Sequence, residues 1–393
     1  MQPTDKDLKE FKAVWRECRP GQLLARAKLV ELAGRVLHGK KFINNVTIGD
    51  CLEVLKLIPD NSIDSVVTDP PAGIGFMNKE WDSDKGGRDK WIEWLARILC
   101  ECNRVLKPGG HALVWALPRT SHWTAFALEN AGFEIRDIQH HLFGTGFPKS
   151  LNISKAIDRK QEVKHPKNTP ISESAKQWQG WGTALKPAVE HWLLARKPLS
   201  EKTIAENVLK WDVGGLNIDA CRVETDEVIS AEYGQRSGTG RYSWNLKKKK
   251  IEKQGLWNTK GRFPANLIHD GSPIVLAELP KARFFYCAKA SKAERDLGLE
   301  NMEAKAGIRT NAPRENEAAR TKPTKNNHPT VKAQALMQYL IKLITPPNGI
   351  VLDCFAGSGS TLVAAKTLGH PFIGIEKFQG YVDIAKARLN NNH

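Results

Sequence analysis

The chain has 393 residues, of which 41% are hydrophobic and 26% are charged, as in an ordinary globular protein. No apolar run is long enough to cross a membrane and no signal-type leader opens the chain, so we expect a cytoplasmic protein without membrane contact. The seven cysteines include no Cys-x-x-Cys pair, and a metal centre is therefore not expected.

The net charge is +16, and the middle of the chain carries most of it. Residues 151–326 hold 32 lysine and arginine residues against 21 aspartate and glutamate residues. A basic surface attracts polyanions because their counterions are released on binding. The charge alone fits a solvated basic face equally well, but with the motifs described below it favours nucleic acid as the partner.

Strands and helices alternate along much of the chain. The hydrophobic spacing predicts a strand at 46–48, a helix at 52–57, a strand at 63–67, a helix at 91–106, a strand at 111–115, a helix at 120–131 and a strand at 133–142. Lys107-Pro108-Gly109-Gly110 is expected to end the second helix. A helix at 331–343 and a strand at 350–352 resume the pattern. Such alternation is typical of an α/β fold with a doubly wound, mostly parallel sheet, whose ligand crevice lies at the carboxyl ends of the strands.

Changes in pattern divide the chain into four segments. Residues 1–41 are expected to form a charged helical extension, and 42–198 the first part of the α/β domain. The periodicity weakens over 199–326, which we expect to be an inserted, basic, loop-rich region that includes four lysines at 247–250. Residues 327–393 complete the α/β domain.

Two short motifs follow predicted buried strands. Asp69-Pro70-Pro71-Ala72 follows the strand at 63–67, and Asp353-x-Phe355-Ala356-Gly357-Ser358-Gly359-Ser360-Thr361 follows the strand at 350–352. Glycines let a backbone approach a ligand closely, and the N-terminus of the next helix is positive. A dinucleotide loop would require glycine where Leu362 stands, which disfavours NAD. The next strand ends at Glu376, about twenty residues after the loop, a spacing that suits an acid bound to ribose hydroxyls.

The order of these motifs, with Asp-Pro-Pro first and the glycine loop last, resembles the permuted (beta-class) DNA amino-methyltransferases. The resemblance covers residues 42–393 and implies the Rossmann-like fold of S-adenosylmethionine-dependent methyltransferases, S-adenosylmethionine as cofactor and double-stranded DNA as substrate. It assigns the catalytic half of the domain to 42–198, target recognition to 199–326 and the cofactor-binding half to 327–393. A homodimer is compatible with the sequence.

The same resemblance implies the cofactor-binding residues. The segment 327–332 is similar to the one that closes over the methionine end of the cofactor, although Ala333 stands where the family usually has proline. Asp50 matches an acidic residue near the adenine. The expected cofactor-binding residues are Asp50, His328, Thr330, Lys332, Asp353, Phe355, Gly357, Gly359, Ser360, Thr361 and Glu376.

The expected catalytic residues are Asp69, Pro70 and Pro71. The lone pair of a base amine is delocalised into the ring, and hydrogen bonds from both N–H groups can draw it out of conjugation. Asp69 offers a carboxylate and Pro70 a carbonyl oxygen as acceptors. The prolines restrict the backbone and hold both acceptors in place. The protein therefore chiefly positions and polarises the amine.

The position after Asp-Pro-Pro is normally aromatic in this family and stacks on the extruded base, but here it is Ala72. A base taken out of the duplex needs a stacking surface. Phe76 and Trp81 are the nearby candidates, and either could instead belong to the core.

Several further blocks resemble the adenine methylases common in phages and prophages, among them Gly144 to Ser150, Trp178 to Pro187 and Phe263 to Asn266. Aspartate rather than serine before Pro-Pro favours site-specific adenine-N6 methylation, of the kind found in restriction-modification systems, over cytosine-N4 methylation. Cytosine-C5 methylation is excluded because no Pro-Cys pair occurs. A protein-glutamine or RNA methylase would not be expected to carry the basic insert. A DNA-binding protein that keeps the fold but has lost catalysis through Ala72 is the remaining alternative.

Overall fold

The computed structural model describes residues 42–76, 79–144, 146, 150–162, 172–223, 261–278, 285–286, 290–304 and 323–391. The expected helical extension at 1–41 and the lysines at 247–250 lie outside these residues, as does most of the polar tract before residue 323. In the described part of the chain, no helix has the length and apolar character needed to cross a membrane.

Nine strands of the described residues form one sheet. Their order is β1 (Asn45–Ile48), β9 (Phe372–Glu376), β8 (Val351–Asp353), β2 (Ile63–Thr68), β3 (Leu106–Ala116), β5 (Val189–Arg196), β4 (Glu134–Leu142), β6 (Leu267–His269) and β7 (Phe285–Tyr286). β5 runs antiparallel to both of its neighbours, and the other pairs are parallel. The expectation of a mostly parallel sheet is confirmed.

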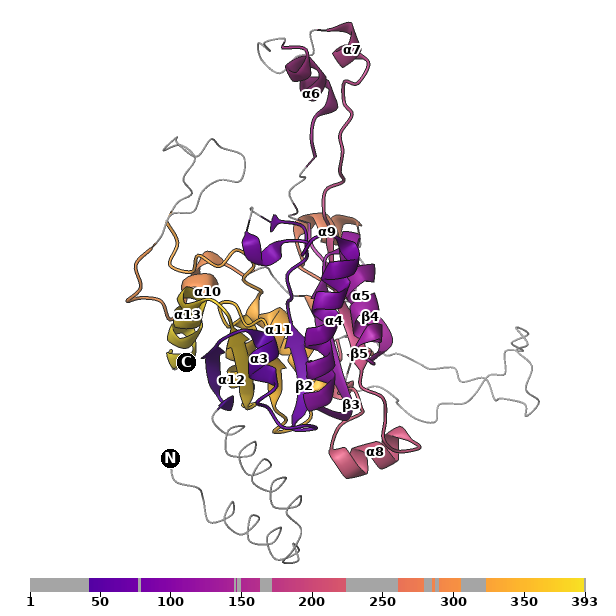
Figure 1. Ribbon diagram of the computed structural model, residues 1–393, viewed down its shortest axis with the longest axis vertical. Helices are drawn as coiled ribbons and strands as arrows, with labels where there is room; N and C mark the ends of the chain where they lie inside the picture. The colour runs from indigo at the N-terminus through magenta and orange to yellow at the C-terminus, as the bar shows by residue number, and fades with distance from the viewer. Residues whose placement is uncertain are drawn as a thin grey trace, which may run out of the picture.

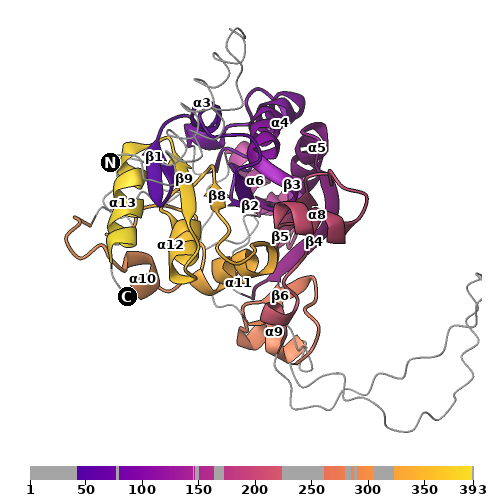
Figure 2. The same ribbon diagram turned by 90° about the horizontal axis from the view of Figure 1, so that it is seen from below.

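Helices cover both faces of the sheet (Figure 2). One face carries α3 (Cys51–Leu55), α4 (Arg88–Val105) and α5 (Ser121–Asn130), and the other carries α11 (Gln334–Ile344), α12 (Ser360–Thr367) and α13 (Gln379–Asn390). On α4, Trp91, Leu95, Leu99 and Cys102 are buried, which is the spacing of one helical face. The fold is therefore doubly wound, as the alternation of predicted elements indicated.

Shorter elements complete the described chain. They are η2 (Glu80–Asp82), η3 (Pro118–Thr120), α6 (Ile153–Lys160), α7 (Glu173–Lys176), α8 (Ile204–Trp211), η4 (Asp219–Cys221), α9 (Pro273–Glu278) and α10 (Lys292–Asp296). β6 and β7 come from the segment 199–326 and extend the central sheet, since His140 of β4 pairs with Leu267 of β6. Part of the region expected to be an insert is thus continuous with the sheet.

The largest difference from the predicted boundaries lies at the start of β3. The helix α4 ends at Val105, as the Lys-Pro-Gly-Gly run suggested, but β3 already begins at Leu106 rather than at His111. Ile63 pairs with Leu106, and the next pair is Ser65 with His111. This shift in register accommodates the proline and glycines inside the strand, so a long-range pairing overrides the local turn signal.

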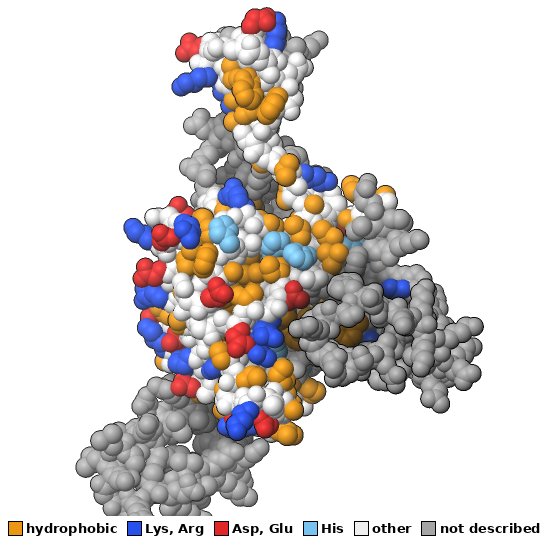
Figure 3. Space-filling model, turned by 90° about the vertical axis from the view of Figure 1, so that its right-hand side faces the viewer, with side chains coloured by type: hydrophobic (Ala, Val, Ile, Leu, Met, Phe, Trp, Pro, Cys, Tyr) orange, Lys and Arg blue, Asp and Glu red, His pale blue; other side chains and the backbone are white. Residues whose placement is uncertain are grey.

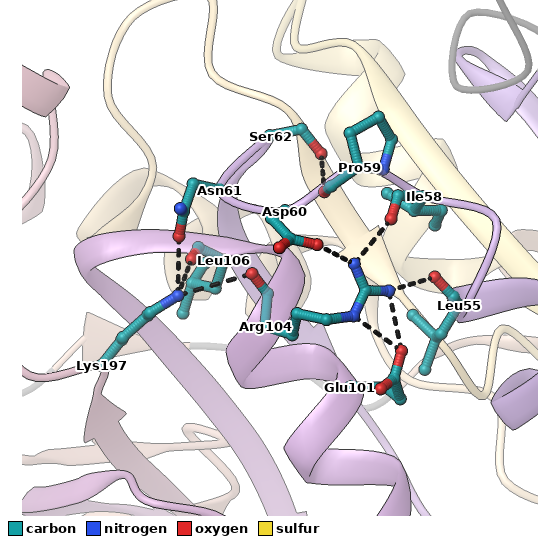
Figure 4. A network of polar contacts seen from close by, with 10 residues as sticks. All are labelled: Leu55, Ile58, Pro59, Asp60, Asn61, Ser62, Glu101, Arg104, Leu106 and Lys197. Carbon is teal, nitrogen blue, oxygen red and sulfur yellow. Dashed lines mark hydrogen bonds and ion pairs between the residues drawn. The ribbon is translucent and has the colours of Figure 1, made fainter. Parts of the chain in front are cut away.

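Arg104, in the last turn of α4, fastens the connection between α3 and β2 (Figure 4). Its guanidinium donates to the carbonyl oxygens of Leu55, at 2.8 Å, and Ile58, at 2.9 Å. It also forms ion pairs with Asp60 and Glu101. Leu55 is the last residue of α3, and its carbonyl oxygen also accepts the backbone N–H of Ile58 at 2.9 Å, so Arg104 adds a second donor at the end of this helix.

The strand order reverses between β8 and β2. The chain continues from β8 to β9 on one side, and from β2 to β3 on the other. In open α/β sheets the ligand crevice lies at such a point, outside the carboxyl ends of the strands. Ser65 pairs with Val351, so the two motifs that follow these strands emerge side by side.

Candidate active site

A cavity of about 310 Å³ lies at the carboxyl ends of β1, β2, β8 and β9. Most of the expected site residues line it: Asp50, Asp69, Pro71, Trp81, His328, Thr330, Lys332, Asp353, Phe355, Gly357, Ser360, Thr361 and Glu376. Pro70, Gly359 and Phe76 are not part of this lining. The fold therefore brings both motifs, far apart in sequence, to one cavity.

A buried hydrogen bond joins the two motif strands. The Thr68 hydroxyl donates to Asp353 Oδ1 at 2.7 Å, and the backbone N–H of Phe355 donates to the same oxygen at 3.1 Å. Burial raises the pKa of the Asp353 carboxyl to about 6, while hydrogen bonds from Thr361 and Thr68 oppose the rise. Asp353 thus fixes the start of the glycine loop against the strand that carries Asp69.

Two glycines of the loop adopt left-handed backbone conformations. Gly357 has φ +51°, and a Cβ there would lie 2.7 Å from Nε2 of His328. Gly359 has φ +79°, and a Cβ there would lie 2.9 Å from the Ala385 side chain of α13. Gly357 therefore lets His328 approach the loop, whereas Gly359 serves the packing of α12 on α13.

Glu376 ends β9 and faces the glycine loop. Its Oε2 accepts the N–H of Gly357 at 2.8 Å, and its Oε1 accepts the N–H of Phe378 at 2.9 Å. Burial raises the pKa of its carboxyl, and these backbone donors oppose the rise. Each oxygen keeps a further lone pair for a ligand hydroxyl. Asp50 caps α3 just after β1, the strand beside β9, and pairs with Lys377 at 3.3 Å.

Lys332 lies between Asp69, which follows β2, and Glu190 of β5. Its ammonium lies 3.2 Å from Asp69 Oδ2, 3.7 Å from Glu190 Oε2 and 4.2 Å from the centroid of the Trp115 ring. Trp115 Nε1 donates to Glu190 Oε2 at 3.1 Å. Burial raises the pKa of Asp69 to about 6, with Lys332 opposing the rise and Glu190 adding to it. Burial lowers the pKa of Lys332, but the two carboxylates outweigh this effect and raise the pKa above its usual value, so Lys332 stays charged.

His328 packs between the glycine loop and α13. Its ring meets the ring of Tyr381 edge-on, with centroids 4.5 Å apart. Burial and the nearby cations, first among them Lys332, lower its pKa to about 3, so the imidazole is neutral at physiological pH. The backbone N–H of Thr330 lies 3.4 Å from its Nδ1 and donates to it. His328 therefore lines the cavity as a neutral, hydrogen-bonding side chain and not as a cation.

The loop after Asp-Pro-Pro is held by Asp82, which is 1% exposed. The backbone N–H groups of Gly73 and Phe76 donate to the Asp82 carboxylate at 3.0 and 2.6 Å. The carbonyl of Ala72 accepts a hydrogen bond from the Thr120 hydroxyl at 3.4 Å. Of the two candidate stacking residues near this loop, Trp81 lines the cavity and Phe76 does not. Within the described residues no cluster of side chains could hold a metal ion.

Comparison with known proteins identifies the chain. The family model of the DNA methylases that act on N6 or N4 amines matches residues 63–387. The chain belongs to this N6/N4 DNA methylase family. The Type II methyltransferase M.HindIII of Haemophilus influenzae is 25% identical to this methylase over 377 residues, which are 86% of this chain and 93% of that protein.

Two solved structures are similar to the methylase at low identity. The M1.HpyAVI–SAM complex is 21% identical, with a TM-score of 0.41, over 88% of this chain and 99% of that one. The cytosine-N4-specific PvuII DNA methyltransferase is 15% identical, with a TM-score of 0.43, over 88% of this chain and 86% of that one.

Sequence reasoning missed four side chains that shape the site of this methylase. Glu190 of β5 contacts Lys332, Trp115 contacts Glu190, and Asp82 organises the loop after Asp-Pro-Pro. Arg388 of α13, which is buried, donates to the carbonyl of Ser358 at 2.7 Å. Only Asp82 adjoins a residue that the sequence singled out, the stacking candidate Trp81. The other three make contacts between residues that are far apart in sequence, and no local spacing of residues reveals such contacts.

Proposed function

We propose that this DNA methylase transfers a methyl group from S-adenosylmethionine to the N6 amine of adenine within a specific sequence of double-stranded DNA. One observation carries the proposal: Asp69 of the Asp-Pro-Pro motif lines the same cavity as the glycine loop and Glu376. A methyl donor and an acceptor amine can meet only where both sites open into one space.

The cavity suits S-adenosylmethionine as the cofactor. Its volume, about 310 Å³, is at the lower end of the range of about 300–1,000 Å³ usual for small-molecule sites. In this proposal Glu376 accepts the ribose hydroxyls, Asp50 approaches the adenine, and the loop at Gly357 follows the ligand closely. His328, Thr330 and Lys332 lie at the methionine end. When bound, S-adenosylmethionine supplies an activated methyl group on a sulfonium centre.

The residues of the chain position and polarise the target amine. The Asp69 carboxylate accepts one amine N–H and the carbonyl of Pro70 accepts the other, which draws the lone pair out of the ring. Lys332, at 3.2 Å, favours the ionised form of Asp69 and orients it. Trp81 offers the stacking surface that Ala72 lacks. In this scheme Asp69 need not be a strong base, since the methylated amine loses its proton readily.

Asp69 in place of serine favours adenine-N6 over cytosine-N4, which is the alternative product of this family. The second alternative is a protein that binds DNA without methylating it, because Ala72 replaces the usual aromatic residue. The ion pair between Asp69 and Lys332 argues against this reading, since it preserves a charged acceptor inside the cavity.

The remaining parts of the proposal follow the resemblance in sequence. The protein is of the permuted, phage or prophage type and acts in the cytoplasm. Residues 42–198 and 327–393 form its catalytic and cofactor-binding halves, and 199–326 recognises the target sequence. A homodimer is also part of the proposal, and a measurement of the mass in solution tests it.

The experiment that tests the function uses the purified protein, S-adenosylmethionine and unmethylated duplex DNA. The DNA is digested to nucleosides and the products are identified by mass. N6-methyladenine is the expected product, and N4-methylcytosine would overturn the choice of base. A protein that binds the cofactor but methylates no base would support the inactive DNA-binding alternative.

A further inference from the structure

A long arm leaves the sheet at the edge that holds the active-site cavity. It comprises residues 150–188, of which 150–162 and 172–188 are described, and it carries α6 and α7 at its tip (Figure 1). The arm follows the carboxyl end of β4 and leads into the first residues of β5. Glu190, the second residue of β5, contacts Lys332 beside Asp69. The arm is therefore rooted next to the catalytic residues and extends away on their side of the molecule.

Polar contacts give the arm a defined structure. The N–H of Ile153 donates to the carbonyl of Trp181 at 3.1 Å, and the N–H of Leu151 donates to the Thr183 hydroxyl at 2.9 Å. The fully buried Asp158 accepts the N–H of Ser172 at 3.1 Å. These bonds tie the outgoing and returning segments together. The arm thus holds its shape largely through hydrogen bonds instead of a large apolar core.

Large hydrophobic side chains of the arm lie on its surface. Leu185 is 92% exposed, Trp181 61% and Trp178 43%, and the two indole rings meet edge-on with centroids 5.1 Å apart. Figure 3 shows hydrophobic side chains gathered on one side of the arm, with lysine and arginine side chains beside them. An exposed apolar patch on a segment with little core of its own marks an interaction surface.

The charge of the arm identifies the partner as a polyanion. The described residues of the arm, 150–162 and 172–188, contain five lysine and arginine residues against three aspartate and glutamate residues. Arg159 and Lys160, at the end of α6, are both exposed. Basic side chains contact DNA phosphates, and apolar or aromatic side chains press against sugars and base steps in the groove. A second copy of the chain would bring the same positive charge and would be repelled.

We infer that the described residues of the arm, 150–162 and 172–188, form a DNA-contacting element, which binds the duplex beside the base that enters the cavity. This inference rests on the proposed function and extends it. It adds to the region 199–326 a second contact with DNA, which follows the backbone and does not read the sequence. Because the arm and the cavity share one edge of the sheet, DNA held by the arm lies on the side from which Asp69 is reached (Figure 1).

The test compares three variants of the full-length protein. The first is Trp178→Ser with Trp181→Ser, and the second is Arg159→Glu with Lys160→Glu. The matched control is Lys202→Glu with Leu209→Ser, at the exposed surface near α8, at the opposite end of the sheet (Figure 1). DNA affinity is measured by fluorescence anisotropy over a range of salt concentrations. Cofactor affinity and product formation are measured on the same samples.

We expect both arm variants to bind DNA at least tenfold more weakly than the wild type and to keep the cofactor affinity of the wild type. The control variant should bind DNA and cofactor as the wild type does. The DNA affinity of the variant Arg159→Glu with Lys160→Glu should also depend less steeply on salt. Each lost phosphate contact lowers the slope of log affinity against log salt concentration by about 0.9. Wild-type DNA affinity in both arm variants would overturn the inference. So would a wild-type dimer that dissociates in the tryptophan variant without loss of DNA affinity. If the wild type binds cofactor but forms no methylated base, the proposed function fails separately from the arm.

Discussion

Lys332 forms an ion pair with Asp69, at 3.2 Å, while its ammonium also lies over the ring of Trp115. The pair connects the segment 327–332, expected to close over the cofactor, with the expected catalytic carboxylate. The same lysine contacts Glu190 at 3.7 Å, so one cation lies between two carboxylates. Lys332 lowers the pKa of Asp69 and Glu190 raises it, so the two side chains have opposite effects that can be measured.

The activity should fall in acid as Asp69 becomes protonated. The carboxylate must be ionised to accept the amine N–H, and burial raises its pKa to about 6. Below that pH, log kcat/KM is expected to fall by about one unit per pH unit, since kcat/KM reports groups of the free enzyme. Lys332→Met should move the midpoint to higher pH, and Glu190→Gln should move it to lower pH. Shifts of the same sign in both variants would contradict the assigned roles.

Asp69→Ala should abolish methyl transfer and leave cofactor affinity unchanged. Removing one fixed polar partner of the reacting group typically lowers turnover by about a hundredfold or more. Asp69→Asn is the matched variant, because it keeps the size of the side chain and removes the charge. Turnover is measured by methyl incorporation into DNA, and affinity by titration with the cofactor. Near wild-type turnover in Asp69→Ala would refute the mechanism.

Trp81→Ala should lower turnover more than Phe76→Ala, because Trp81 lines the cavity and Phe76 does not. Stacking of one base on an aromatic ring contributes about 1–3 kcal/mol, so a loss of about fivefold or more is expected. Trp81→Phe keeps an aromatic ring and should recover part of the activity. Single-turnover rates on duplex DNA provide the measurement, and equal rates in the two alanine variants would exclude Trp81 as the stacking surface.

Gly357→Ala should weaken cofactor binding. The residue has φ +51°, and the new methyl group would lie 2.7 Å from His328 Nε2. Strain of this kind costs about 1–3 kcal/mol, so we expect the Kd for S-adenosylmethionine to rise about fivefold or more. Gly380→Ala is the control, since a Cβ at that position would have no neighbour within 4 Å. Calorimetric titration should show a change in the first variant alone.

Arg104→Met should lower the free energy of unfolding without altering the cavity. The carbonyl oxygen of Ile58 loses the Arg104 donor, whereas that of Leu55 keeps the backbone N–H of Ile58, and a buried group left unpaired costs about 1–3 kcal/mol. Arg97→Met, at an exposed position of the same helix, is the control and should leave stability within about 0.5 kcal/mol. Urea denaturation measures both. Equal stability of the two variants would show that the contacts in Figure 4 contribute little.

The sequence predicted those features that rest on local patterns. The apolar face of α4 is visible in the spacing of Trp91, Leu95 and Leu99, and each motif directly follows its strand. Side chains placed by long-range pairing could not be found in this way. Glu190 reaches Lys332 because β5 enters the sheet antiparallel, beside β3, after the arm. Nor could β6, with three residues, and β7, with two, be recognised by periodicity.

The pairing of β1 with β9 also governs when the protein can fold during synthesis. Within the described sheet β1 lies at the edge, and its partner β9 comes last in the chain among the described strands. β2 likewise cannot complete its pairing on one side until β8 has been synthesised. Domains fold as units, and contacts between distant segments slow folding. Until both late strands emerge, the nascent chain carries Asp69 but no glycine loop, so it exposes unpaired strand edges to chaperones and cannot yet modify DNA.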